Sequence, residues 1–215
     1  MKKILLTIIG SLFIVSGAWA GISGSVHDFT EGGGGPVAIT GESQLCVFCH
    51  TPHNATTTDA PLWNHAETSA TYTPYESGSL NATVGQPAGV SKLCLSCHDG
   101  TVGIDAYGAQ TGVPTMITND RGALVGTNLT NDHPISFTYD TALATADGTL
   151  HNPASATTDL GGTIEADLLF GTAGSKTMEC ASCHDVHNGT TAMAAGNLLR
   201  IDNAGSDLCM TCHDK

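Results

Sequence analysis

Cysteine and histidine occur in this chain in one repeated arrangement. A cysteine is followed three positions later by a second cysteine and then directly by a histidine, and this C-x-x-C-H pattern occurs four times. The four copies use all eight cysteines: Cys46, Cys49 and His50; Cys94, Cys97 and His98; Cys180, Cys183 and His184; Cys209, Cys212 and His213. On a helical turn, positions i, i+3 and i+4 share one face, so two thiols and one imidazole are expected to point the same way.

This arrangement matches the covalent attachment site of c-type haem. Two thiols add to the vinyl groups on one haem edge, and the imidazole reaches the iron as the proximal ligand. Pairs of C-x-x-C can also bind zinc, and a single C-x-x-C can be a redox dithiol, but neither explains a histidine after every second cysteine. Disulfides, common in exported chains, fit this spacing poorly. The sequence therefore predicts four covalently bound haem c groups.

Each haem iron has a sixth position that a methionine or a second histidine can fill, and histidine holds the reduction potential lower. Ten histidines less four proximal ones leave six, whereas two of the four methionines after residue 20 lie inside or beside attachment motifs. Histidine is therefore the expected distal ligand. The distal candidates are His53, His187, His133, His27 and His65.

The candidates differ in their sequence context. His53 and His187 each follow a proximal histidine by three residues, and because that histidine already holds the near side of its iron, each is expected to ligate a neighbouring haem. His133 precedes Pro134, which favours an extended backbone suited to a rigid ligand loop. His27 precedes the glycines of residues 32–35, a stretch expected to be flexible. His151, in a turn-like segment, is expected to face solvent.

Short helices must present the motifs. A serine or threonine stands three residues before each first cysteine, where it could cap a helix N-terminus: Ser43, Ser91, Thr177 and Ser206. Gly100 and Gly189 follow two of the proximal histidines and could end those helices. Aromatic residues are only 5% and glycines number 26, so the chain has few large side chains for a core of its own. We expect mostly irregular coil, with a short α-helix at each motif, a few short strands, and haem as the core.

The motifs fall into two similar pairs. The segment from Cys46, with its H-x-x-H-N element, aligns with that from Cys180, and the segment from Ser91 aligns with that from Ser206. Duplication is the favoured explanation, although attachment helices resemble one another in any case. We expect a single tetrahaem domain over 21–215. It contains two haem-pair units, at about 21–105 and 175–215, joined by a loop-rich insert with strand-like pieces such as residues 134–139.

The first 20 residues have the features of a secretory signal peptide. Lys2 and Lys3 precede a short apolar run, and Ala18-Trp19-Ala20 suits cleavage before Gly21. The run is shorter than the ~20 residues of a membrane span, and no later segment is expected to cross a bilayer. A net charge of -13 argues against nucleic acid and anionic lipid as partners. We expect an exported protein.

The motifs resemble those of a known family. C-V-F-C-H-T-P-H-N-A from Cys46, P-L-W-N-H from Pro61, C-L-S-C-H-D-G-T-V from Cys94 and N-D-H-P-I from Asn131 together resemble the multihaem c-type cytochromes of metal-reducing bacteria, and among them the tetrahaem subunits of extracellular nanowires. The resemblance implies stacked haems with two histidine ligands each, and one distal histidine supplied by the adjacent subunit. His27 or His65 would be that donor.

Three functions remain open on the sequence alone. The first is an electron-transfer protein that forms a conducting homopolymer at the cell surface, with redox proteins or extracellular acceptors as partners. The second is a monomeric periplasmic tetrahaem shuttle, which needs every ligand within one chain. The third is a haem enzyme, which needs an iron with an open position. With enough histidines for every distal position, an enzyme is the least expected.

Overall fold

The structure, a computed structural model, describes residues 21–55, 59–108, 114–119, 122–187 and 198–214. The expected signal peptide and the expected helix end at Gly189 lie outside these ranges. Within them, no helix combines the length and the apolar character that a bilayer crossing needs.

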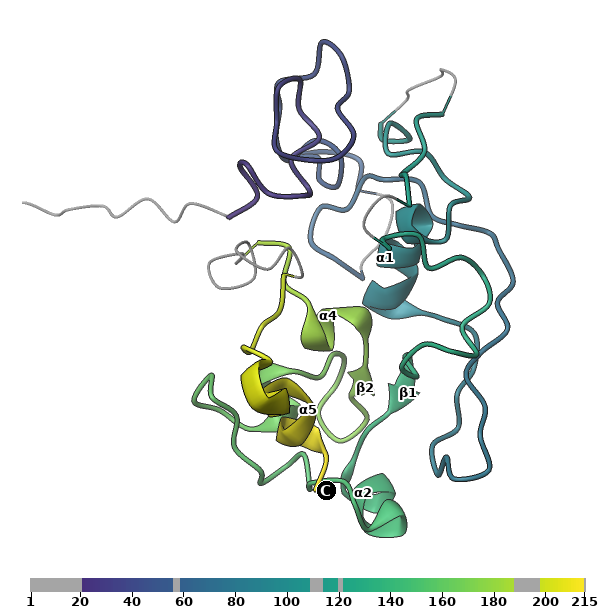
Figure 1. The fold of residues 1–215 in the computed structure, drawn as a ribbon, viewed down its shortest axis with the longest axis vertical. Helices are drawn as coiled ribbons and strands as arrows, with labels where there is room; N and C mark the ends of the chain where they lie inside the picture. The colour runs from purple at the N-terminus through teal and green to yellow at the C-terminus, as the bar shows by residue number, and fades with distance from the viewer. Residues whose placement is uncertain (1–20, 56–58, 109–113, 120–121, 188–197, 215) are drawn as a thin grey trace, which may run out of the picture.

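Irregular chain dominates, and short helices interrupt it (Figure 1). The α-helices are α1 (Gly89–His98), α2 (Thr141–Asp147), α3 (Ile164–Asp167), α4 (Cys180–Cys183) and α5 (Asp207–Cys212), with the 3-10 turn η1 (Ala204–Ser206) before α5. Two strands, β1 (Phe137–Thr138) and β2 (Thr177–Met178), pair antiparallel with Phe137 opposite Met178. The expected fold class, mostly coil with short helices and few strands, is confirmed.

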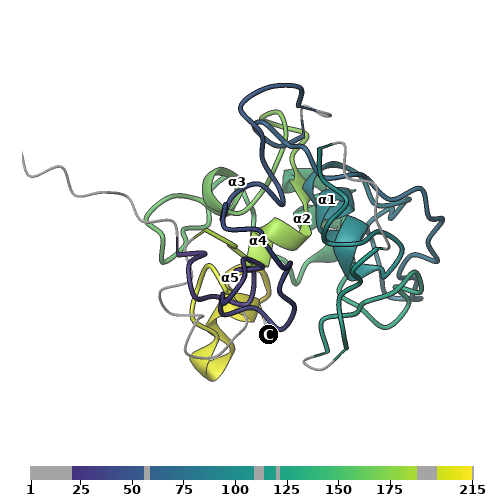
Figure 2. The same cartoon turned by 90° about the horizontal axis from the view of Figure 1, so that it is seen from above.

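Three of the four motifs lie on helices. The second, third and fourth motifs occupy α1, α4 and α5, and in both views α4 lies between α1 and α5 (Figure 1 and Figure 2). The first motif forms a single turn, in which the His50 N–H donates to the Cys46 carbonyl at 2.9 Å and no longer helix follows. The prediction of a helix at every motif was therefore wrong for the first, although the one helical hydrogen bond that the motif needs is present.

The predicted helix starts were mostly wrong. Ser91 lies inside α1, whose N-cap is Ala88, and Thr177 lies in β2. Ser206 is the N-cap of α5, but its side chain makes no capping hydrogen bond. Tertiary contacts explain the shift at Ser91, because its hydroxyl accepts the N–H of Cys180 on α4 at 2.9 Å. The predicted end at Gly100 is confirmed, since α1 ends at His98 and Gly100 has a φ of 77°.

A buried carboxylate joins α1 to α4. Glu179, the N-cap of α4, accepts hydrogen bonds from the Ser91 N–H (3.3 Å), the Ser136 hydroxyl (3.0 Å) and the Thr177 hydroxyl (2.7 Å). Its own N–H donates to the Ser182 hydroxyl, which completes a capping box. These bonds fix the second and third motifs relative to each other.

Apolar side chains form three separate clusters rather than one core. Among the described residues, the largest packs Phe137, Tyr139, Ile164 and Leu168 of the insert, and two smaller ones are centred on Phe48 and on Leu95. The insert also contains α2 and α3, which the sequence did not predict. Each begins at a capping side chain, with Asp140 accepting the Leu143 N–H and Thr163 accepting the Ala166 N–H.

Ile164 is the anchor of the largest cluster, with no exposed surface. We expect Ile164→Ala to lower the free energy of unfolding by about 3 kcal/mol, because it removes buried methyl groups and leaves a cavity. Denaturant titration of the purified protein measures this loss. Leu160→Ala, at a position in the same insert that is 48% exposed, is the matched control and should change the stability by less than about 0.5 kcal/mol. Equal losses in the two variants would contradict this description of the core.

Candidate functional site

Histidine rings from distant parts of the chain lie in pairs. Each of three pairs joins the proximal histidine of one motif to one of the distal candidates. The pairs, with their ring-centroid separations, are His27 with His98 (6.0 Å), His50 with His187 (5.9 Å) and His133 with His213 (6.4 Å).

These separations suit a metal ion between two rings. With metal–nitrogen bonds of about 2 Å, two imidazoles on opposite sides of one metal ion have ring centroids roughly 6 Å apart. All three measured separations lie within half an ångström of that value. The residues present therefore fit a haem iron with two histidine ligands at the first, second and fourth motifs.

Backbone carbonyls orient three of these rings. The Nδ1 atoms of His50, His98 and His133 lie 2.7, 2.7 and 2.9 Å from the carbonyl oxygens of Pro61, Ala123 and Pro134. An Nδ1–H donated to a carbonyl leaves the lone pair on Nε2, and metal-binding histidines commonly make this second hydrogen bond. Nothing in the sequence indicates these carbonyl partners, since any residue type can supply one.

His27 has a buried, neutral imidazole of the kind that can bind a metal. Burial, followed by the charges of His98, His184 and His187, lowers the pKa of its imidazole to about 4. It is therefore neutral at pH 7, the form that can bind a metal. Its Nδ1 is buried and has no hydrogen-bond partner among the described residues.

The loop that carries His27 is compact. The Asp28 carboxylate accepts the Gly24 N–H (2.8 Å) and the Thr30 hydroxyl (2.5 Å). A Cβ on Gly33 would lie 2.3 Å from Oδ1 of Asp28, so only glycine fits there. The expectation of a flexible, far-reaching segment was therefore wrong: residues 32–35 pack back onto the loop, and His27 faces its own chain.

The remaining histidines do not pair with a proximal ring among the described residues. The ring of His65 is 2% exposed, and its two nitrogens lie 2.8 and 2.9 Å from the carbonyl oxygens of Ala66 and Gly103. A neutral imidazole carries one N–H and can donate to only one of these carbonyls, so His65 stays a candidate ligand. His53 is exposed. His151 is half-buried, and its N–H donates to the Cys212 carbonyl at 2.9 Å.

The first and third motifs share a backbone pairing. The residue after each proximal histidine donates its N–H to the carbonyl of a leucine. The residue two positions after that leucine donates its N–H to the carbonyl of the motif's second cysteine. The bonds are Thr51 to Leu62 (2.9 Å), Asn64 to Cys49 (2.8 Å), Asp185 to Leu198 (2.7 Å) and Arg200 to Cys183 (2.8 Å). Leu62 and Leu198 also share a left-handed φ, of 56° and 50°. Two copies of one ancestral unit would have this correspondence.

Thiols of successive motifs lie close together. A hydrogen bond to Cys180, reinforced by burial, raises the pKa of the Cys94 thiol well above its usual value. Burial and then the charge of Cys49 raise the pKa of Cys97 to about 12. For Cys183, burial and then Cys209 raise the thiol pKa. The second motif thus contacts the third, and electrostatic interactions connect the first motif with the second and the third with the fourth.

Residues 173–215 match a family model described as a doubled CXXCH motif. The match covers the third and fourth motifs, together with the strand that precedes them. No curated protein sequence matches the chain. The C-terminal part of this chain therefore carries a multihaem motif like that of c-type cytochromes, and C-x-x-C-H in such a motif implies covalently bound haem c.

The pairing of His133 with His213 is testable by substitution. In His133→Ala, the iron at the fourth motif loses its distal ligand, so one of the four haems should change from low-spin to high-spin. Electron paramagnetic resonance of the oxidised, purified protein counts the two species. His151→Ala is the control and should leave every haem low-spin. A fully low-spin spectrum in His133→Ala would exclude His133 as a ligand.

Proposed function

We propose that this protein is an exported tetrahaem electron-transfer cytochrome whose subunits join into an extracellular filament. The doubled CXXCH motif supports electron transfer by c-type haem. The observation that carries the electron-transfer role is the set of three ring pairs, each with a separation suited to one iron. Bound haem supplies an iron that takes up and releases one electron.

The histidine pairs favour electron transfer over catalysis. A haem that binds a substrate keeps one axial position open, whereas two imidazoles fill both. At the first, second and fourth motifs, the chain itself supplies a second ring. With both axial positions filled, the iron neither gains nor loses a ligand when an electron arrives or leaves. A small change in geometry suits rapid electron transfer.

The adjoining motifs supply the continuity that a carrier needs. A hydrogen bond between Cys94 and Cys180, and the electrostatic influence of Cys49 on Cys97 and of Cys209 on Cys183, support an order of attachment sites from the first to the fourth. This order follows the chain from its N-terminal to its C-terminal motif. It gives electrons a continuous route through the subunit.

His53 is our candidate for the histidine that joins subunits, in place of His27 and His65. In the duplicated H-x-x-H-N element, His53 corresponds to His187, whose ring lies beside the proximal His50 of the other unit. The corresponding target of His53 is the proximal histidine of the third motif, His184. Both His53 and His184 are exposed. We infer that His53 of one subunit ligates the iron at His184 of the next.

This contact is head-to-tail, because the donor and the acceptor are different surfaces of the same chain. Such heterologous contacts make rings where the rotation closes, and open filaments where it does not. Two subunits that each have a net charge of -13 repel one another. A histidine–iron bond between them would offset this repulsion and fix their relative orientation. In this proposal the filament is extracellular, and its electrons pass to acceptors outside the cell.

Substitution of His53, followed by electron microscopy of protein sheared from the cell surface, tests the filament. The wild-type protein should form ordered filaments with a repeating subunit. His53→Ala should give discrete particles in which one haem in four is high-spin, because the joining ligand is gone. His151→Ala is again the control and should form normal filaments.

Two results would contradict the proposal at different levels. Discrete wild-type particles that persist at high concentration would exclude the filament and leave a monomeric periplasmic shuttle. Normal filaments from His53→Ala would keep the filament and exclude His53 as the joining ligand.

A further inference from the structure

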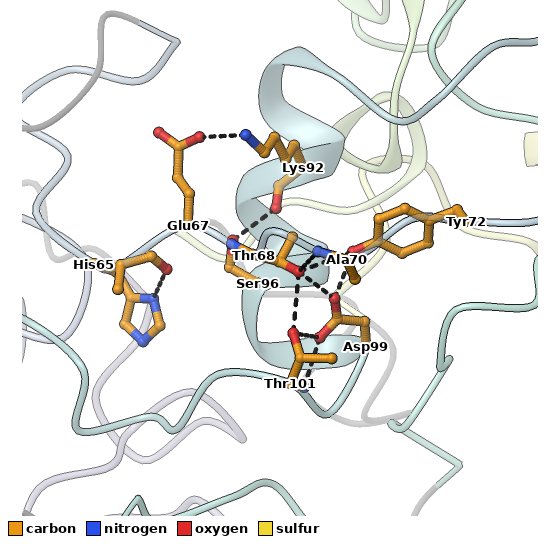
Figure 3. A network of polar contacts seen from close by, with 10 residues as sticks. His65, Glu67, Thr68, Ala70, Tyr72, Lys92, Ser96, Asp99 and Thr101 are labelled. Atoms are coloured by element: carbon orange, nitrogen blue, oxygen red, sulfur yellow. Dashed lines mark hydrogen bonds and ion pairs between the residues drawn. The ribbon is translucent and has the colours of Figure 1, made fainter.

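A buried carboxylate follows the proximal histidine of the second motif directly. Asp99 is only 6% exposed, and it lies at the end of α1 within a network of hydroxyl groups (Figure 3). Its Oδ2 accepts hydrogen bonds from the hydroxyls of Tyr72 and Thr68, the latter at 2.7 Å. Its Oδ1 accepts the N–H and the hydroxyl of Thr101, both at 2.7 Å.

The four hydrogen bonds determine the charge of Asp99. Every partner donates, so the carboxyl group acts only as an acceptor, which is the role of the ionised form. A buried carboxylate with several donors is stabilised as an anion. Thr68 is itself fixed, because its N–H donates to the Ser96 hydroxyl at 3.0 Å inside α1. The network thus holds one negative charge in a defined place.

The charge acts on the attachment site. Asp99 is the C-cap of α1 and follows the proximal His98 directly. It lies two residues after Cys97, one of the two cysteines that anchor haem at this motif. In a partly buried environment, charges interact more strongly than in water. The field of Asp99 therefore reaches the position where haem would be bound.

We propose that Asp99 lowers the reduction potential of the haem held at the second motif. The proposal rests on the function proposed above. A nearby buried anion stabilises Fe(III), which carries one more positive charge than Fe(II), and so disfavours reduction. Tyr72, Thr68 and Thr101 are positioning residues that keep the anion in place.

At the other motifs, the residue that follows the proximal histidine is not an equivalent buried anion, although the buried Glu179 precedes the third motif. Thr51 follows the proximal histidine of the first motif. Asp185, after the third, lies 3.9 Å from the guanidinium of Arg200, which offsets its charge. Asp214, after the fourth, is exposed, and the pKa of the Cys212 thiol there is raised by burial, Cys183 and Cys209. The chain thus offers Asp214 as a sequence-matched control for Asp99.

Potentiometric titration of the haem-loaded protein, followed by visible and electron paramagnetic resonance spectra, tests the proposal. Asp99→Asn keeps the shape of the side chain and removes the charge. The potential of one of the four one-electron components should become more positive by about 59 mV. This shift corresponds to a tenfold change in its oxidised-to-reduced ratio at a given applied potential. Asp214→Asn should shift its component by less than a third of that amount. In both variants all four haems should stay in their wild-type spin states.

The outcomes separate this proposal from the proposed function. If Asp99→Asn binds four haems and its potentials match the wild type, or if Asp214→Asn shifts as far, the proposal is overturned while the cytochrome function stands. A wild-type protein without four haems would overturn the function itself. If Asp99→Asn fails to fold, Tyr72→Phe is measured instead. It keeps the anion but removes one donor, so the affected potential should move down, and an unchanged potential would equally overturn the proposal.

Discussion

The contact between paired imidazole rings is the constraint on which the rest of this structure depends. The described helices are at most ten residues long, and helices this short are unstable unless packing holds them. The apolar clusters are small and separate. The ring pairs connect residues 27 with 98, 50 with 187 and 133 with 213, and so span nearly the whole described chain. A metal ion between each pair would link these segments where hydrophobic burial is weakest.

The polar network around the rings explains how so irregular a chain can hold them at defined separations. Carbonyls of Pro61 and Ala123 fix the proximal rings, and Glu179 fixes α1 against α4. Each of these partners belongs to a segment without regular structure or at a helix terminus, where backbone groups are available for such bonds. Irregular backbone is therefore useful here, because it brings carbonyl oxygens to ring nitrogens that a regular helix would leave without a partner.

The sequence predicted what depends on local spacing and failed where distant contacts decide. C-x-x-C-H spacing indicated the attachment sites and their proximal histidines without help from the fold. The choice among spare histidines was harder, because His27 and His65 differ only in what surrounds their ring nitrogens. Ser91 was a reasonable helix cap on local grounds, yet its hydroxyl bonds to the third motif. Long-range partners of this kind leave no periodic trace in the sequence.

Duplication would explain why the two units are alike in backbone. In two closed copies, each H-x-x-H element would serve the other copy. Here His187 of the second unit lies beside His50 of the first, whereas in the proposed filament His53 of the first unit serves the next subunit. A similar divergence separates Asp99 from Asp214, which occupy matching positions but differ in burial. Because burial decides how strongly a charge acts, identical motifs can hold haems of unequal potential, and unequal potentials give a carrier a preferred distribution of electrons.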